Sequence, residues 1–295
     1  MATSIYNRGH IYFSMGDLEE ALKNYTRSLQ IRKEAGDWIQ TAENYHAIGS
    51  IYREKANYSE ALKNYTEAIK LFQSSENKMG ISNTYINMGL VYLNQGNYPE
   101  ALKSQLAAIK IKDEIGDKYG LSACYITLGY IYRDQQNQSE ELKQYFNALK
   151  IAKEIGAKDR LSNAYNALAR AYVNQANYPE AFKNHFSALK IREEIGDKLG
   201  ISVSYSGLGY CYELTGNYTE AMNYYLKALK LNEEMGADEY LYVSHLDIGF
   251  TLLKQAALEK KKTGKLKKYK EALQSFNKAL PIVNGAGDWQ DAVEL

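Results

Sequence analysis

Apolar residues recur along this chain at spacings of three and four, which place side chains on one face of an α-helix. Tyr45, Ile48 and Tyr52 form one such set, with the small residue Gly49 at its centre. The same set returns every 40 residues, and a second stretch with helical spacing lies between consecutive sets. The pattern predicts two helices in every 40 residues and no β-strand.

A small residue marks the period more sharply than any other position. It is, in turn, Gly9, Gly49, Gly89, Gly129, Ala169, Gly209 and Gly249. Internal similarity with a period of about 20–50 residues is the signature of stacked repeats. We therefore expect seven repeats, in which the small residue lets the second helix approach the first closely.

Six of the seven second helices carry their own start signal, an Asn or Asp followed by Glu at the third helical position. The pairs are Asp17/Glu20, Asn57/Glu60, Asn97/Glu100, Asn137/Glu140, Asn177/Glu180 and Asn217/Glu220. This spacing predicts a capping box, in which each side chain of the pair bonds the backbone amide of the other. Glycines such as Gly36 and Gly116 then follow the predicted ends of the second helices, where a left-handed residue commonly closes a helix.

The pattern Tyr45-x2-Ile48-Gly49-x2-Tyr52, continued by Ala61-x3-Tyr65, resembles the tetratricopeptide repeat signature, with Tyr in place of its Trp and Phe. The resemblance covers the whole chain and implies an all-α, right-handed α-solenoid of seven helix-turn-helix repeats in a single array. The expected repeats are about 1–36, 37–76, 77–116, 117–156, 157–196, 197–236 and 237–287, with the start of an eighth at 288–295. The period of 40 residues, longer than the usual 34 of the family, predicts longer helices.

Repeats of this length look like two known groups, the Pins-type spindle-orientation scaffolds and the bacterial repeat regions fused to sensor kinases, nucleotide cyclases or caspase-like domains. Pins-type grooves carry Asn directly after the glycine. This chain has His10, Ser50, Leu90, Tyr130, Arg170, Tyr210 and Phe250 there. We therefore do not expect this chain to bind Pins-type ligands. The high content of tyrosine and asparagine favours the bacterial group.

The resemblance implies that the first helices line a concave groove, through positions near the small residue that the core does not use. The groove residues expected from it are Tyr6, His10, Phe13, His46, Arg53, Asn83, Ile86, Leu90, Leu93, Ile126, Tyr130, Arg133, Asn163, Asn166, Arg170, Asn174, Tyr210 and Glu213.

Two features of this groove bear on its ligand. Ile86, Leu90, Leu93 and Ile126 are apolar where the core requires nothing apolar, so they predict a hydrophobic pocket. The neighbouring asparagines can pair with the backbone of an extended peptide. Arg133 and Arg170 can hold a carboxylate in a bidentate pair. The alternative interpretation of the same residues is an ordinary mixed surface that faces solvent.

The seventh repeat contains an insertion of lysine-rich sequence around 259–270. We expect it to lengthen both helices of that hairpin around Thr263 and Gly264 as a solvated protrusion, with contact to an anionic partner as the alternative. The chain also ends without the polar capping face that terminal repeats need. We therefore expect a segment of a longer protein, with self-association through the uncapped C-terminal repeat or cover from residues 288–295.

Composition and charge exclude several functional classes. Hydrophobic residues make up 45% and charged residues 24%, which is typical of folded globular chains. Lys and Arg total 36 against 35 Asp and Glu, so no net field favours nucleic acid or an anionic membrane. No apolar run approaches the roughly 18 residues of a membrane span. The first ten residues show no charged start followed by an apolar stretch, so we expect no signal peptide.

The residues that could carry chemistry are few. His10 and His46 have no acid or Cys at ligand spacing, and a metal needs three or four ligands. His185 and His245 fall in core positions, and Cys124 and Cys211 are expected to be buried thiols. Each glycine recurs singly, so no phosphate-binding loop is present. We expect no catalytic residues, no metal site and no cofactor.

The sequence therefore predicts a scaffold that is not an enzyme and that binds a protein or peptide in the groove. The alternative is the sensory or dimerisation region of a bacterial signalling enzyme, a histidine kinase or nucleotide cyclase, whose catalytic domain lies outside this chain. Divergence among the repeats argues against a consensus design. The compartment is the cytoplasm by default, or the periplasm if the segment comes from a membrane-bound sensor.

Overall fold

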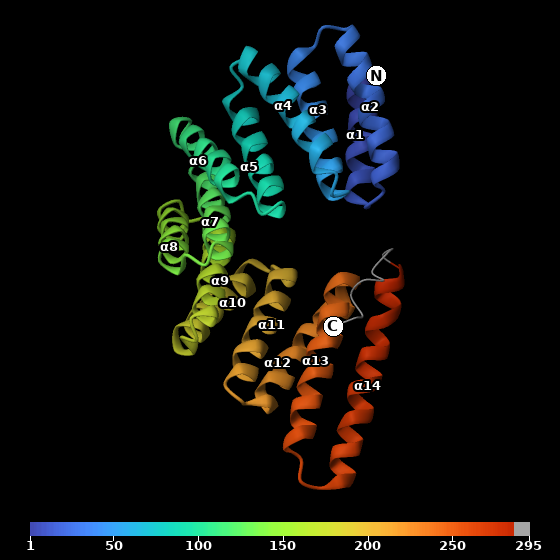
Figure 1. Cartoon of the computed structure of the whole chain (residues 1–295), viewed down its shortest axis with the longest axis vertical. Helices are drawn as coiled ribbons and strands as arrows, with labels where there is room; N and C mark the ends of the chain where they lie inside the picture. Colours follow the sequence, from blue (N-terminus) through green and yellow to red (C-terminus); the bar gives the residue numbers. More distant parts are fainter. Residues whose placement is uncertain (286–295) are drawn as a thin grey trace. The chain divides into compact units, whose positions relative to one another are not determined.

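The computed structural model describes residues 1–285, with side chains to residue 280. These residues form fourteen α-helices in consecutive antiparallel pairs and no strand (Figure 1). The predicted all-α fold of helix-turn-helix repeats is therefore confirmed. The chain divides into two compact units, residues 1–155 and residues 156 onward, and each is described by itself.

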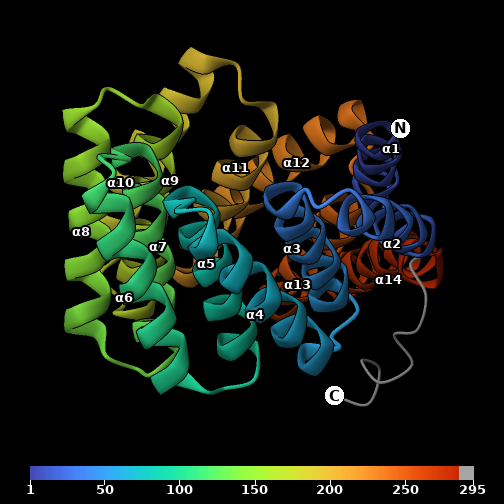
Figure 2. The same cartoon turned by 90° about the horizontal axis from the view of Figure 1, so that it is seen from above.

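The first unit contains four helix pairs, which Figure 2 shows from above. The helices are α1 (Ala2–Ser14), α2 (Leu18–Glu34), α3 (Trp38–Glu54), α4 (Tyr58–Ser74), α5 (Lys78–Asn94), α6 (Tyr98–Glu114), α7 (Lys118–Asp134) and α8 (Gln138–Glu154). The second unit contains three pairs. They are α9 (Lys158–Asn174), α10 (Tyr178–Ile195), α11 (Lys198–Leu214), α12 (Tyr218–Met235), α13 (Asp238–Leu258) and α14 (Lys262–Gly285).

An aromatic ring lies against the small residue in most hairpins. A Cβ atom added at Gly49 would lie 2.7 Å from Cε1 of Tyr65, whose side chain is fully buried. The same geometry joins Gly209 to Tyr225 and Gly249 to Phe276. Glycine lets the second helix come this close, because any side chain would occupy the space of the ring.

The turns between helices follow a finer period than the repeat. Every twentieth residue from Gly16 to Gly236 has positive φ, and four of these residues, Ala56, Glu76, Gln136 and Ala176, are not glycine. The left-handed conformation ends one helix and redirects the chain into the next.

The start signals form only half of the predicted capping box. The Asn57 side chain accepts a hydrogen bond from the Glu60 backbone amide at 3.3 Å. The Asn57 amide, however, donates to the Tyr52 carbonyl in the preceding turn at 2.8 Å. The Glu60 carboxylate has no cap amide left to accept from, and it pairs with Lys63 instead. The equivalent Glu–Lys pair forms in four further repeats, as between Glu140 and Lys143, whereas in the sixth repeat Glu220 accepts from the Asn223 side-chain amide.

Buried cations join some second helices to the cap of the following helix. Lys112, 3% exposed, places Nζ 2.7 Å from Oδ2 of Asp117, and Asp117 accepts from the Gly120 amide. Arg192 and Asp197 occupy the same two positions 80 residues later, with Nε 4.0 Å from Oδ2. Pairing of this kind is what makes a buried charge tolerable.

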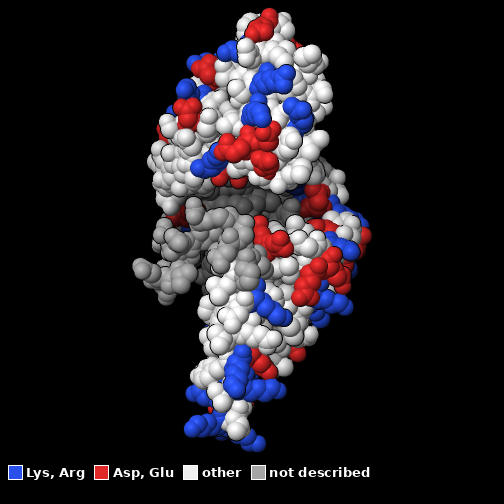
Figure 3. Space-filling view, turned by 90° about the vertical axis from the view of Figure 1, so that its right-hand side faces the viewer, with Lys and Arg blue, Asp and Glu red and all other residues white. Residues whose placement is uncertain are grey.

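The seventh hairpin is the longest, with 21 residues in α13 and 24 in α14. The insertion therefore lengthens both helices, as expected, but the turn lies at 259–261. Thr263 and Gly264 belong to α14. The physical reason is the Glu259 carboxylate, which accepts from the Lys261 amide and so starts the helix earlier. Lysines gather at this end of the hairpin, at the bottom of Figure 3.

The last described apolar face is only partly covered. Leu273 and Leu280 are 60% and 53% exposed, whereas Phe276 is half-buried and packs edge-on against Phe250 with ring centroids 5.2 Å apart. Residues 288–295, which were expected to cover this face, lie outside the described residues. Self-association through it stays a prediction.

Substituting the small residue tests the ring contact with an internal control. We expect Gly49→Ala to destabilise the chain by about 1–3 kcal/mol through overpacking against Tyr65. Gly89→Ala is the matched control, because its Cβ would meet Gln105 Oε1 at an ordinary 3.4 Å. That change should be neutral or stabilising, since Ala favours helix over Gly. Urea unfolding of both variants measures the difference, and equal losses would show that the ring is not the constraint.

Candidate peptide-binding face

The first helices contact one another from one repeat to the next, α3 with α5 and α9 with α11. This contact places them on the inner side of each unit. The inner face is defined here by the first-helix residues one and four after the small residue and three and six before it. It is the face on which the groove was predicted.

A hollow of about 220 Å³ opens on the inner face of the first unit. Its walls come from three consecutive repeats, namely Tyr6, Glu43, His46, Phe72, Asn77, Met79, Gly80 and Asn83. Tyr6, His46 and Asn83 were predicted groove residues, and the structure brings them together. The other five were missed, because Met79, Asn77 and Gly80 lie at the start of α5 and Phe72 lies on a second helix. Of these five, only Glu43 could have been predicted from the sequence, because it lies at a groove position, six residues before Gly49.

His46 is held as a neutral imidazole inside this face. Thr84 donates its hydroxyl proton to the Gly80 carbonyl at 2.7 Å, so its oxygen accepts from Nδ1 of His46 at 3.0 Å. Nε2 of His46 then accepts from the Asn87 amide nitrogen at 3.1 Å. Burial, followed by the charge of Arg53, lowers the His46 pKa to about 4. Both ring nitrogens are used, so His46 can offer a ligand only its ring surface.

Two buried cations stand behind the hollow and hold its walls. The Arg32 guanidinium lies 4.5 Å from the Tyr6 ring centroid, with Nη1 4.0 Å from the Glu43 carboxylate. At the other end, Lys112 Nζ donates to Asn83 Oδ1 at 2.9 Å. Tyr6, Glu43 and Asn83 are therefore positioned from within the protein, which keeps the rotamer freedom lost on binding small.

The predicted apolar set is only partly accessible. Ile86, Leu90 and Leu93 are half-buried on α5 and can contact a ligand. Ile126 is 8% exposed, so its assignment to an open pocket was wrong. The reason is the contact between neighbouring first helices. His46, at the position equivalent to Ile126, faces α5 in this way, and the spacing within a single helix does not reveal such a contact.

The two predicted carboxylate-binding arginines differ in their surroundings. Arg133 is half-buried over the Tyr130 ring, 5.1 Å from its centroid, and its Nε donates to Asp134 at 2.8 Å. Arg170 is exposed on α9. Arg133 belongs to the first unit and Arg170 to the second, so their use by one ligand stays a prediction.

In the second unit, Asn163 is exposed on α9 and accepts from Nη2 of the buried Arg192 at 3.2 Å. This bond repeats the one between Lys112 and Asn83 in the first unit. Asn166 is half-buried, whereas Asn174 and Tyr210 are exposed.

Glu213 was predicted as a groove residue and is instead buried at 8% exposure. It accepts from the Thr251 hydroxyl at 2.8 Å and pairs with Lys254 at 2.5 Å, both on the next first helix. Its assignment as an accessible groove residue was therefore wrong, and its carboxylate ties two repeats together. Burial, followed by the Glu213 charge, raises the pKa of the neighbouring Asp247 to about 7.

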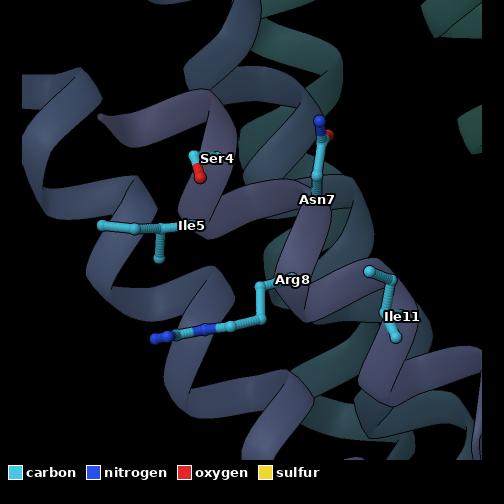
Figure 4. A pocket seen from close by; sticks show the side chains of 5 residues that line it. All are labelled: Ser4, Ile5, Asn7, Arg8 and Ile11. Atoms are coloured by element: carbon cyan, nitrogen blue, oxygen red, sulfur yellow. The ribbon is translucent and has the colours of Figure 1, made fainter.

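The remaining predicted groove residues lie on the first two repeats. His10 is exposed, Phe13 packs on the core beside Ile48, and Arg53 donates to Asn87 at 3.1 Å. A second hollow is lined by Ser4, Ile5, Asn7, Arg8 and Ile11, all from α1 (Figure 4). A single helix supplies these residues, so they form an open surface of the first repeat.

The other side chains that could take part in catalysis or metal binding are buried in the core. His185 and His245 are 2% and 7% exposed, and Cys124 and Cys211 are buried, as predicted. Among the described residues, no three His, Cys, Asp or Glu side chains gather as a metal site would require. No described helix is both long and apolar enough to cross a bilayer.

The tetratricopeptide repeat family model matches residues 1–74, 80–154 and 160–234. The chain therefore belongs to the tetratricopeptide repeat family. Each of the three matches covers two repeats. Lys112 and Arg192 are also two repeats apart. No curated protein sequence matches the chain significantly.

Solved structures share the fold at low sequence identity. BtubC from P. vanneervenii is 19% identical with a TM-score of 0.65, over 74% of this chain and 92% of that chain. A signal transduction ATPase with a tetratricopeptide repeat sensor from Pyrococcus horikoshii is 18% identical with a TM-score of 0.72, over 97% of this chain and 43% of that one. A Rap protein complexed with competence and sporulation factor is 15% identical with a TM-score of 0.66, over 95% and 74%.

The buried histidines predict a loss of stability in acid. Burial, followed by the charges of Arg192 and Arg170, lowers the His185 pKa to about 4, below its unfolded value near 6.5. The neutral ring therefore stabilises the fold fully above pH 6.5, and this contribution is lost as the pH falls toward 4.

His185→Gln is the matched variant, because Gln105 occupies this position two repeats earlier. Between pH 7 and pH 4, the native chain should lose on the order of 3 kcal/mol more unfolding free energy than the variant. Urea titrations at both pH values measure this difference, and parallel losses in the two proteins would contradict it.

Proposed function

We propose that the chain binds a segment of a partner protein along the inner face of its first helices. The observation that carries the proposal is the hollow walled by three consecutive repeats. Its lining includes the exposed Met79 and the buried Phe72, which suit an apolar side chain, and Asn83 is oriented to bond a peptide backbone. Concave sites with an apolar lining and a few fixed polar groups are typical binding sites.

The ligand that suits this face is an extended or helical peptide with an apolar anchor. The half-buried Ile86, Leu90 and Leu93 continue the apolar surface along α5, the helix that also carries Met79 and Asn83. Arg133, half-buried on α7 of the same unit, suits an acidic group of the peptide, and binding of that group should weaken with salt. Membership of the tetratricopeptide repeat family supports a protein partner, as does the fold shared with a Rap protein complexed with competence and sporulation factor.

A second candidate function is that of a sensory region in a larger signalling protein. The likeness to an ATPase that carries a tetratricopeptide repeat sensor favours it, because this chain spans 43% of that protein. In that role the inner face would still be the part that receives the signal. Neither function requires a catalytic step by this chain.

Affinity capture with matched variants tests the inner face. Glu43→Ala with Asn83→Ala removes two polar walls of the hollow, and Leu90→Asp places a charge on its apolar continuation. We expect each variant to weaken capture of a specific partner from an extract of the source cells by at least about tenfold.

Thr66→Asp, an exposed change on the second helix α4, is the control and should leave capture intact. Quantitative mass spectrometry of the captured proteins is the readout. Equal capture by the native chain and by both inner-face variants would contradict the proposal.

A further inference from the structure

One exposed position on the second helices is polar in some repeats and large and apolar in others. It is Thr26 and Thr66 in the first two repeats and Asn277 in the last. In the four repeats between them it is Leu106, Phe146, Phe186 and Leu226, which are 51%, 47%, 40% and 49% exposed. Repeats with threonine or asparagine at this position form the same hairpin, so packing does not require a large apolar residue there. Exposed apolar residues that gather within one unit mark contact with another molecule.

The second unit surrounds this position with further aromatic rings. Phe186 on α10 meets Tyr224 on α12 edge-on at 6.5 Å, and Tyr224 stacks on Tyr212 at 5.5 Å with a 13° interplanar angle. Phe182 lies 4.6 Å from Tyr212. In the first five repeats the position of Tyr224 is polar, as Asn24, Asn64, Ser104, Gln144 and Asn184. The sixth repeat therefore departs from the repeat pattern at a position that extends the exposed apolar surface.

Lysines flank this aromatic surface on one side. Lys190 and Lys230 follow Phe186 and Leu226 by four residues, one helical turn along α10 and α12. Lys227 lies over the Tyr224 ring, 4.8 Å from its centroid. All three lysines are exposed, and no carboxylate of the described residues lies within ion-pair distance of them.

We propose that α10 and α12 carry a second docking surface, separate from the inner face, for an acidic amphipathic segment of a partner protein. The partner's apolar side chains pack on Phe186, Leu226 and the Tyr224 ring. Its Asp or Glu side chains pair with Lys190, Lys227 and Lys230. Aromatic anchors in such contacts contribute most of the affinity, and charged pairs at the rim contribute mainly to the rate and specificity of association.

The arrangement of charge favours a narrow acidic segment over a bilayer or a second copy. Glu193 and Glu233 lie one further turn along the same helices, so the lysines form a band between an apolar and an acidic one. An anionic bilayer would cover all three bands and meet the glutamates as well. If two copies of the chain packed against each other through this surface, the lysines of one copy would face and repel those of the other. A linear segment can follow the apolar and basic bands alone.

Differential peptide selection tests the proposal on the full chain. Random 16-residue peptides displayed on phage are selected on the immobilised native chain, with excess soluble Phe186→Thr/Leu226→Thr as competitor. The variant should fold normally, since the chain itself has threonine at this position in two repeats, and an unchanged thermal melt verifies this. We expect the surviving peptides to carry net negative charge and at least two large apolar residues.

Fluorescence anisotropy on the labelled survivors then measures where they bind. Phe186→Thr/Leu226→Thr and Lys190→Glu/Lys230→Glu should each weaken binding by at least about tenfold. Leu258→Thr, which changes an apolar residue that is 69% exposed elsewhere in the unit, should have no effect. Glu43→Ala/Asn83→Ala should also leave these peptides bound, which separates this surface from the proposed inner-face site.

Three outcomes would overturn the proposal. No peptide survives the competition, the survivors are neutral or basic, or the threonine variant binds them as well as the native chain does. Cosedimentation with phosphatidylserine vesicles is the parallel measurement. If the native chain sediments with them and the threonine variant does not, the surface belongs to a membrane and the proposal is wrong.

Discussion

The contact between a ring on the second helix and a small residue on the first determines how most of the hairpins close. Where the small residue is glycine, the ring of Tyr65, Tyr225 or Phe276 fills the space that a Cβ would need. Where it is Ala169, the position of the ring on the second helix carries the smaller His185, which lies against Gly207 on the next first helix. This contact fixes the rotation of both helices about their axes. It thereby decides which residues face the interior and which remain free to bind.

The fold could be predicted from the sequence because it is repeated in it, and every hairpin supplies an independent copy of the pattern. The candidate site was predicted less well, because it depends on contacts between hairpins. Ile126 and Glu213 have the right place on their own helix but are buried, and Glu213 is bonded to Thr251 and Lys254 of the following repeat. The capping glutamates show the same limit. The turn before each cap already uses the cap amide, which the local sequence does not reveal.

The two proposed binding surfaces, on the inner and outer sides of the hairpins, differ in their chemistry. On the inner face, buried Arg32 and Lys112 hold the polar walls of the hollow, so the site is prepared before a ligand arrives. On the outer side of α10 and α12, the apolar residues lie beside stacked aromatic rings, and no carboxylate of the described residues pairs with the neighbouring lysines. A repeat protein can carry both, because the core consumes only one stripe of each helix.

Amide hydrogen exchange of the native chain is the most direct test of the ring contact as the determinant of hairpin stability. The third repeat lacks the contact, since Gly89 faces Gln105, whereas the repeats before and after it have Tyr65 and Tyr145. The account predicts faster exchange in α5 and α6 than in α3 and α4 or in α7 and α8, because each hairpin opens with its own free energy. Equal or greater protection of α5 and α6 would contradict it.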